Sequence, residues 1–168
     1  PEVALERVRK QIGRVPSSGA LHFLLGQVHQ ARAEMRPAEE AYLKAIELEP
    51  RLTGPYLQLG QLYAREGRYE PALAKLEAAL AVNPRNVGTL MLIGVTHQRR
   101  GDTARAREAF EKILADHPRF APAANNLAWI LAEQGGDEDR ALQLAQLAKE
   151  LAPDDGAASD TLGWILYR

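Results

Sequence analysis

The chain has 168 residues, of which 26% are charged and 46% hydrophobic, with a formal net charge of −1 and no cysteine. This length suffices for one compact domain or a short repeat array, and the near-neutral charge and the lack of a long apolar run disfavour nucleic-acid binding and a membrane span. The absence of cysteine excludes a disulfide scaffold, thiolate metal sites and cysteine nucleophiles.

A fixed spacing of 34 residues runs through the chain, with one step of 35 near the end. Such a period indicates a repeat protein. The extra residue falls most simply at Gly135–Gly136, where earlier repeats carry the single glycines Gly67 and Gly101. Two series keep the spacing: Pro16, Pro50, Pro84, Pro118 and Pro153, and Ala4, Ala38, Ala72, Ala106 and Ala141.

Within each period the apolar residues recur at helical spacing and predict two helices joined by a turn, without strands. Prolines such as Pro55 and Pro122 fit the first turn of a helix, and Gly67, Gly101 and Gly135 fit the turn between helices. In chain order we expect a lone second helix at 1–18, four hairpins at 19–52, 53–86, 87–120 and 121–155, and a lone first helix at 156–168. We count nine helices in a single domain.

Repeat two carries a recognisable set of packing positions: Tyr56, Leu59, Gly60, Tyr63, Ala72, Leu76, Ala79 and Pro84. With looser matches in the same register elsewhere, the chain resembles the tetratricopeptide repeat family. The resemblance implies an all-α right-handed superhelical solenoid of helical hairpins, whose role is protein binding without enzymatic activity. The half-repeats at both ends and the initial Pro1 lead us to expect a piece of a longer protein.

In this family, a second stripe on each first helix lines the concave surface. That stripe predicts a groove for a partner, with residues Phe23, Gln27, Leu57, Gln61, Met91, Val95, Asn125, Trp129, Asp160, Trp164 and Tyr167. Both tryptophans of the chain occupy the same position in adjacent repeats. Tryptophan is enriched in binding hot spots, but the same rings can simply pack between neighbouring helices. Packing is the favoured interpretation for Leu57 and Val95.

Two asparagines lie within the predicted first helix of repeat four, where asparagine has poor helix propensity. Asn125 is the candidate for clamping the backbone of an extended ligand, whereas Asn126 is better explained by hydrogen bonding within the array. The family's clamp for acidic chaperone tails requires lysine, asparagine and arginine. Its positions here hold Phe23, Gln27, Gln58, Gly88 and Leu92, which disfavours such tails and favours an apolar strand or amphipathic helix.

No motif for catalysis, a metal or a cofactor is present. His22, His29 and His97 occupy packing positions, and His117 adjoins a proline in a loop. We therefore predict no catalytic residues, no metal site and no cofactor.

The predicted function is a non-enzymatic module that captures an apolar or amphipathic protein segment, with no nucleic-acid partner. The alternative is a scaffold that self-associates through its open terminal half-repeats into a homo-oligomer. The segments 125–129 and 161–164 are similar to the closing repeats of bacterial envelope-associated tetratricopeptide proteins, including those linked to exopolysaccharide export. This resemblance implies a location at the periplasmic side of the bacterial envelope.

Overall fold

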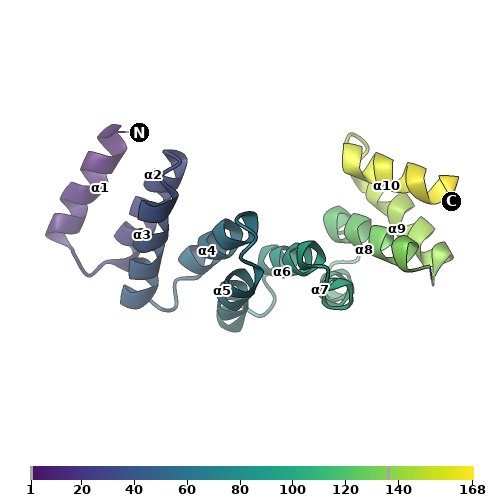
Figure 1. Cartoon of the computed structure of the whole chain (residues 1–168), viewed down its shortest axis with the longest axis horizontal. Coiled ribbons are helices and arrows are strands. Elements are labelled where there is room, and N and C mark those ends of the chain that lie inside the picture. Colours follow the sequence, from purple (N-terminus) through teal and green to yellow (C-terminus); the bar gives the residue numbers. More distant parts are fainter. Residues whose placement is uncertain (1, 136) are drawn as a thin grey trace. The chain divides into compact units, whose positions relative to one another are not determined.

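The computed structural model describes residues 2–135 and 137–168, and these form ten helices and no strand (Figure 1). The expected count of nine is wrong, because a half-repeat, four hairpins and another half-repeat amount to ten. The helices are α1 (Glu2–Arg14), α2 (Gly19–Ala31), α3 (Met35–Leu48), α4 (Thr53–Arg65), α5 (Tyr69–Val82), α6 (Val87–Arg100), α7 (Thr103–Asp116), α8 (Ala121–Gln134), α9 (Glu138–Leu151) and α10 (Gly156–Tyr167). The predicted all-α architecture of helical hairpins is confirmed.

The turns inside the hairpins follow the sequence signals. Gly67, Gly101 and Gly135 adopt the left-handed conformation, with φ of +74°, +85° and +65°. Glycine takes this conformation without the steric cost that a Cβ atom brings. The predicted insertion at Gly136 lies outside the described residues. In the first hairpin Ala33 takes the left-handed position, with φ of +59°.

Two of the second helices begin at an aspartate that caps them. Asp102 Oδ1 accepts the backbone N–H of Arg105 at 3.2 Å, and Asp137 Oδ1 accepts that of Arg140 at 3.1 Å. Each bond satisfies a donor that the first turn of a helix leaves unpaired. The start of α7 and of α9 is thereby fixed by local chemistry.

The chain divides into two compact units, residues 1–89 and residues 90–168, and α6 spans the boundary. In the first unit the core lies between the hairpins α2–α3 and α4–α5. Its buried members are Ala38, Tyr42, Leu59, Leu62, Tyr63 and Ala72, with Phe23, Ile46 and Ala64 packed against them.

Glycines on the first helices allow the second helices to approach. A Cβ atom at Gly60 would lie 2.6 Å from the side chain of Leu76, and one at Gly94 would lie 2.5 Å from the ring of Phe110. Since real Cβ contacts are never this short, the bulky side chain of each second helix fills the space that a glycine leaves open.

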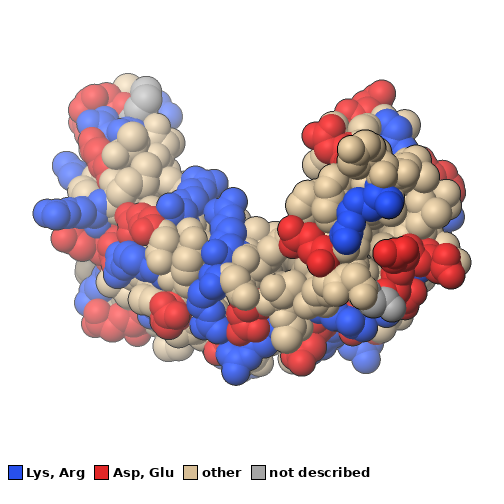
Figure 2. Space-filling model, turned by 45° about the vertical axis from the view of Figure 1, so that its right-hand side comes forward, with Lys and Arg blue, Asp and Glu red and all other residues tan. Residues whose placement is uncertain are grey.

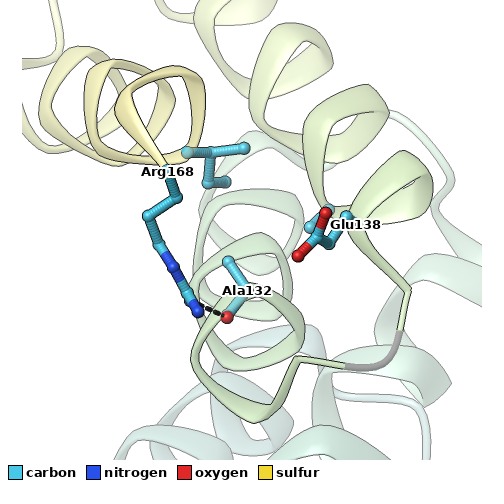
Figure 3. A pocket seen from close by; sticks show the side chains of 5 residues that line it. Ala132, Glu138 and Arg168 are labelled. Atoms are coloured by element: carbon cyan, nitrogen blue, oxygen red, sulfur yellow. Dashed lines mark hydrogen bonds between the residues drawn. The ribbon is translucent and has the colours of Figure 1, made fainter.

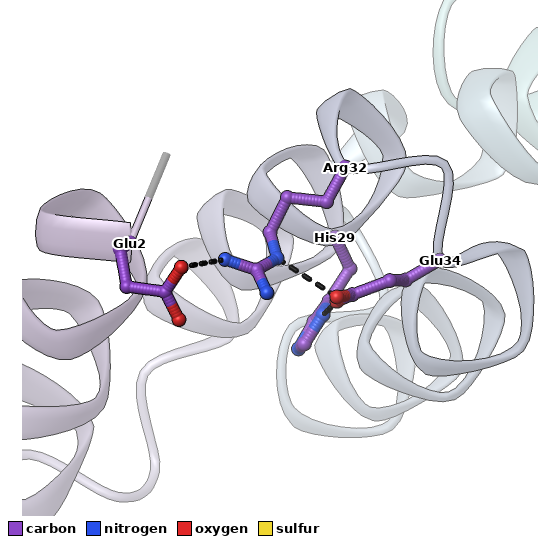
Figure 4. Close-up of polar contacts among 4 residues, drawn as sticks. All are labelled: Glu2, His29, Arg32 and Glu34. Carbon is purple, nitrogen blue, oxygen red and sulfur yellow. Dashed lines mark hydrogen bonds and ion pairs between the residues drawn. The ribbon is translucent and has the colours of Figure 1, made fainter.

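A polar network joins α1 to the first hairpin (Figure 4). Arg32 donates to Glu34 at 2.8 Å and to Glu2 at 3.1 Å, and Nδ1 of the buried His29 lies 2.6 Å from Glu34 Oε2. Two hydrogen bonds hold the pKa of the Glu34 carboxyl below its usual value; the one with His29 has the larger effect and the one with Arg32 the next largest. The histidine thus occupies a packing position, as expected.

In the second unit the core beneath the last repeats is built from small residues. Ala124, Ala148 and Ala158 are buried together, with Leu114, Leu144 and Leu147 packed against them. The helix α10 contacts both α8 and α9. None of the described helices combines the length and the apolar character needed to cross a membrane.

Candidate functional site

The structure distributes the predicted groove residues over the two units. Phe23, Gln27, Leu57 and Gln61 lie in the first unit; Met91, Val95, Asn125, Trp129, Asp160, Trp164 and Tyr167 lie in the second. Every one of these residues keeps some exposed surface, and Tyr167 is 90% exposed. The stripe residues are therefore at least partly accessible in each unit, and Phe23 also packs against the core of the first unit.

The two tryptophans stack on each other. Trp129 on α8 and Trp164 on α10 have ring centroids 4.5 Å apart and planes inclined by 27°. Each indole covers part of the other, and both stay half-buried with area left exposed. Offset aromatic pairs of this kind contribute about 0.5–1.5 kcal/mol beyond their burial. The pair therefore helps to join the two helices while presenting a continuous apolar surface.

The two neighbouring asparagines differ in their hydrogen bonds. Asn126 donates from Nδ2 to the carbonyl oxygen of Pro122 at 2.7 Å, one turn earlier on α8. The oxygen Oδ1 of Asn125 is buried and has no hydrogen-bond partner among the described residues. Leaving an acceptor buried and unpaired costs about 1–3 kcal/mol. Asn126 is thus satisfied within its own helix, whereas Asn125 has an unused acceptor.

Helical register gives these side chains a regular arrangement. Asn125 precedes Trp129 by four residues, and Asp160 precedes Trp164 by four, so each polar residue lies one turn before a tryptophan on the same helix face. Because the two rings stack, the two faces adjoin. We call the set Asn125, Trp129, Asp160 and Trp164 the tryptophan patch.

Arg168 closes the other end of this surface, and sequence reasoning missed it. Its guanidinium lies over the Trp164 ring, 5.0 Å from the centroid. It also donates a hydrogen bond to the Ala132 carbonyl oxygen in the last turn of α8 (Figure 3). The four-residue step from Trp164 to Arg168 is a signal that could have found the ring contact. The bond to Ala132, 36 residues away, leaves no trace in the sequence.

Beside Arg168 lies a small pocket of about 40 Å³, formed where α8, α9 and α10 meet (Figure 3). It is lined by Ala132, Glu138, Ala141, Ile165 and Arg168. A space of this size holds a few water molecules or the tip of one side chain. The pocket is therefore an extension of the surface rather than a site for a small-molecule substrate.

The described residues contain no group of three or more histidine, aspartate or glutamate side chains placed to hold a metal ion. His29 and His97 are buried, in the packing positions that the repeat pattern gave them. Side chains of both charge signs are interspersed over the face drawn in Figure 2, with uncharged areas between them.

Solved structures of bacterial proteins share this fold. The chain is 20% identical to YrrB, described as a TPR protein with an unusual peptide-binding site, at a TM-score of 0.81 over 98% of this chain and 84% of that one. It is 21% identical to MamA, at a TM-score of 0.80 over 89% of this chain and 86% of MamA. It is 24% identical to PilF of Pseudomonas aeruginosa, at a TM-score of 0.77 over 94% of this chain and 78% of PilF.

No curated protein has a significantly similar sequence. Models of the tetratricopeptide repeat match residues 20–52, 55–86 and 91–156, which together make up most of the chain. These matches fall on the hairpins α2–α3 and α4–α5 and on the helices from α6 to α9. The chain therefore belongs to the tetratricopeptide repeat family.

Proposed function

We propose that the tryptophan patch captures an apolar or amphipathic segment of a partner protein, without chemistry. Members of this family are protein-interaction modules, and YrrB is described as having a peptide-binding site. The observation that carries the proposal is the exposed part of the stacked pair Trp129 and Trp164. Met91, on α6 of the same unit, is a further partly exposed apolar residue of the stripe.

Asn125 gives the proposed surface a second element of recognition. A peptide backbone offers N–H donors at regular spacing, and no donor of the described chain occupies Oδ1 of Asn125. A ligand N–H that reaches this oxygen gains about 0.5–1.5 kcal/mol net. This bond fixes the register of an extended segment without reading its side chains.

The test compares the double variant Trp129→Ala/Trp164→Ala with the wild type in a pull-down from an extract of the parent organism. We expect the variant to lose the captured partner while its far-ultraviolet circular dichroism stays helical, because the buried cluster of Ala124, Ala148 and Ala158 contains neither ring. The matched control is Leu43→Ala/Val82→Ala, which removes exposed apolar side chains on second helices. If the tryptophan variant captures the partner as well as the control variant does, the proposal is overturned.

A second candidate function, self-association, is favoured by the open face of α10. Leu166 is 65% exposed, whereas Leu131, His97 and Tyr63 at the same position of earlier repeats are 2%, 4% and 4% exposed. A Cβ atom at Gly163 would meet nothing within 4 Å. On the first helices of the complete hairpins, the equivalent face is covered by the second helix.

The helix α1 offers the complementary surface. It has the pattern of a second helix, and its Ala4 is exposed where Ala38, Ala72, Ala106 and Ala141 are fully buried. We propose that α1 of a second copy covers α10, a head-to-tail contact that can continue into chains of molecules. Light scattering should then show mass rising with concentration for the wild type and for the control Leu43→Glu, and a monomer for Leu166→Glu. A wild type that stays monomeric at high concentration would rule this candidate out.

A further inference from the structure

The tryptophan patch contains one ionisable side chain, the carboxylate of Asp160, and no cationic one. Asn125 Oδ1 has no donor, and the exposed Asp160 forms no ion pair with any described residue. The helices α8 and α10 contain no lysine or arginine, and their acidic residues are Glu133 and Asp160. The exposed carboxylate beside the indole pair therefore favours a partner segment that carries a cation.

Arg168 is the cation nearest to the patch in sequence, and its guanidinium is already engaged. It donates to the Ala132 carbonyl oxygen and lies over the Trp164 ring. Because it follows Trp164 by one turn while Asp160 precedes it by one turn, the two charges lie at opposite ends of the surface. Lys149 on α9 donates to the hydroxyl of Ser159, the neighbour of Asp160 in sequence, but neither it nor Arg168 forms an ion pair with the Asp160 carboxylate.

The contact with Arg168 also shows which groups the indole pair accepts. An indole ring attracts a cation over its face more strongly than the ring of phenylalanine or tyrosine does. The guanidinium carbon of Arg168 stands 5.0 Å from the Trp164 centroid, within the usual range of about 6 Å for such a contact. A basic side chain of a ligand can use the exposed part of the pair in the same way.

We propose that the segment captured by the tryptophan patch carries a lysine or arginine beside its apolar residues, and that this cation lies at the Asp160 end. The inference rests on the proposed function. The exposed Asp160 carboxylate receives the donors of the cation, and the aliphatic stem of the same side chain covers the exposed part of the indoles. Repulsion from Arg168 sets the direction of the segment. An acidic segment would bring its carboxylates next to that of Asp160, and like charges repel.

The chain's only two tryptophans are both in the patch, so its tryptophan fluorescence reports on this site alone. The probes are three tryptophan-free hexapeptides with blocked termini, each of two leucines, two valines and two variable residues. The variable residues are lysine, glutamine or glutamate. Each peptide is titrated at low ionic strength, where a single charge pair is least screened. The measured quantity is the dissociation constant from the change in tryptophan emission.

We expect the lysine peptide to bind about fivefold more tightly than the glutamine peptide, which corresponds to one charge pair of about 1 kcal/mol in water. The glutamate peptide should bind most weakly. Asp160→Asn should remove the preference for lysine over glutamine. Asp154→Asn, which neutralises an exposed carboxylate in the loop before α10, is the matched control and should retain it.

The outcomes distinguish failure of the proposed cation preference from failure of the proposed function. Equal affinity for all three peptides, or a preference for glutamate, would overturn the inference and leave the proposed function standing. If none of the three peptides changes the tryptophan fluorescence, this result would count against the proposed function, that is, against peptide capture by the patch itself. A lysine preference that survives Asp160→Asn would place the cation elsewhere and would also overturn the inference.

Discussion

At the scale of single residues, Ala33 stands where the other hairpins have glycine. Its φ of +59° is the left-handed conformation, and its side chain is exposed, so a change to glycine loses no packing. An L-residue pays about 1–2 kcal/mol in this conformation. Glycine loses about 0.4–1 kcal/mol more backbone entropy on folding, which offsets part of the gain.

Ala33→Gly should therefore raise the free energy of unfolding by roughly 0.5–1 kcal/mol, measured as an increased denaturant midpoint. The reverse change, Gly67→Ala at the equivalent turn, should lower the midpoint by a similar amount. A destabilised Ala33→Gly variant would show that this turn is held in place by something other than its backbone conformation.

At the scale of helices, two glycines at the same repeat position lie in opposite surroundings. Gly94 on α6 faces the fully buried ring of Phe110 on α7, whereas Gly163 on α10 faces open space. Both lie within helices, where alanine is favoured over glycine by about 1 kcal/mol. The difference between the two sites is therefore the presence of a second helix.

We expect Gly94→Ala to lower the melting temperature, because overpacking of this kind costs about 1–3 kcal/mol. Gly163→Ala should leave the melting temperature unchanged or raise it through helix propensity alone. Differential scanning calorimetry on the two variants provides the measurement. If both variants respond alike, the fit of Phe110 against Gly94 does not govern the stability of the hairpin.

At the scale of the whole molecule, the repeat period already predicts most of the fold. The steps of proline and alanine predict where hairpins begin and end, and the glycines predict the turns between helices, where the structure shows them in the left-handed conformation. These features depend on local backbone chemistry and on one repeated packing contact, which a sequence displays directly. Ala33 escaped notice because alanine carries no turn signal.

The candidate surface was less accessible to sequence reasoning. Register predicted that Trp129 and Trp164 lie on adjoining helix faces, but their stacking depends on side-chain rotamers that neighbouring residues set together. The unpaired oxygen of Asn125 and the capture of the Ala132 carbonyl oxygen by Arg168 depend on surroundings far away in the chain. The partner-binding role of these residues stays a prediction.

The placement of both indoles in residues 90–168 has an optical consequence for the whole chain. Residues 1–89 contain tyrosine and no tryptophan, so thermal melting followed by indole emission observes the second unit alone. Melting followed by helical circular dichroism observes all the helices at once. The temperature gap between the two curves is thus a direct gauge of how cooperatively the halves of the array unfold, with no label attached to the protein.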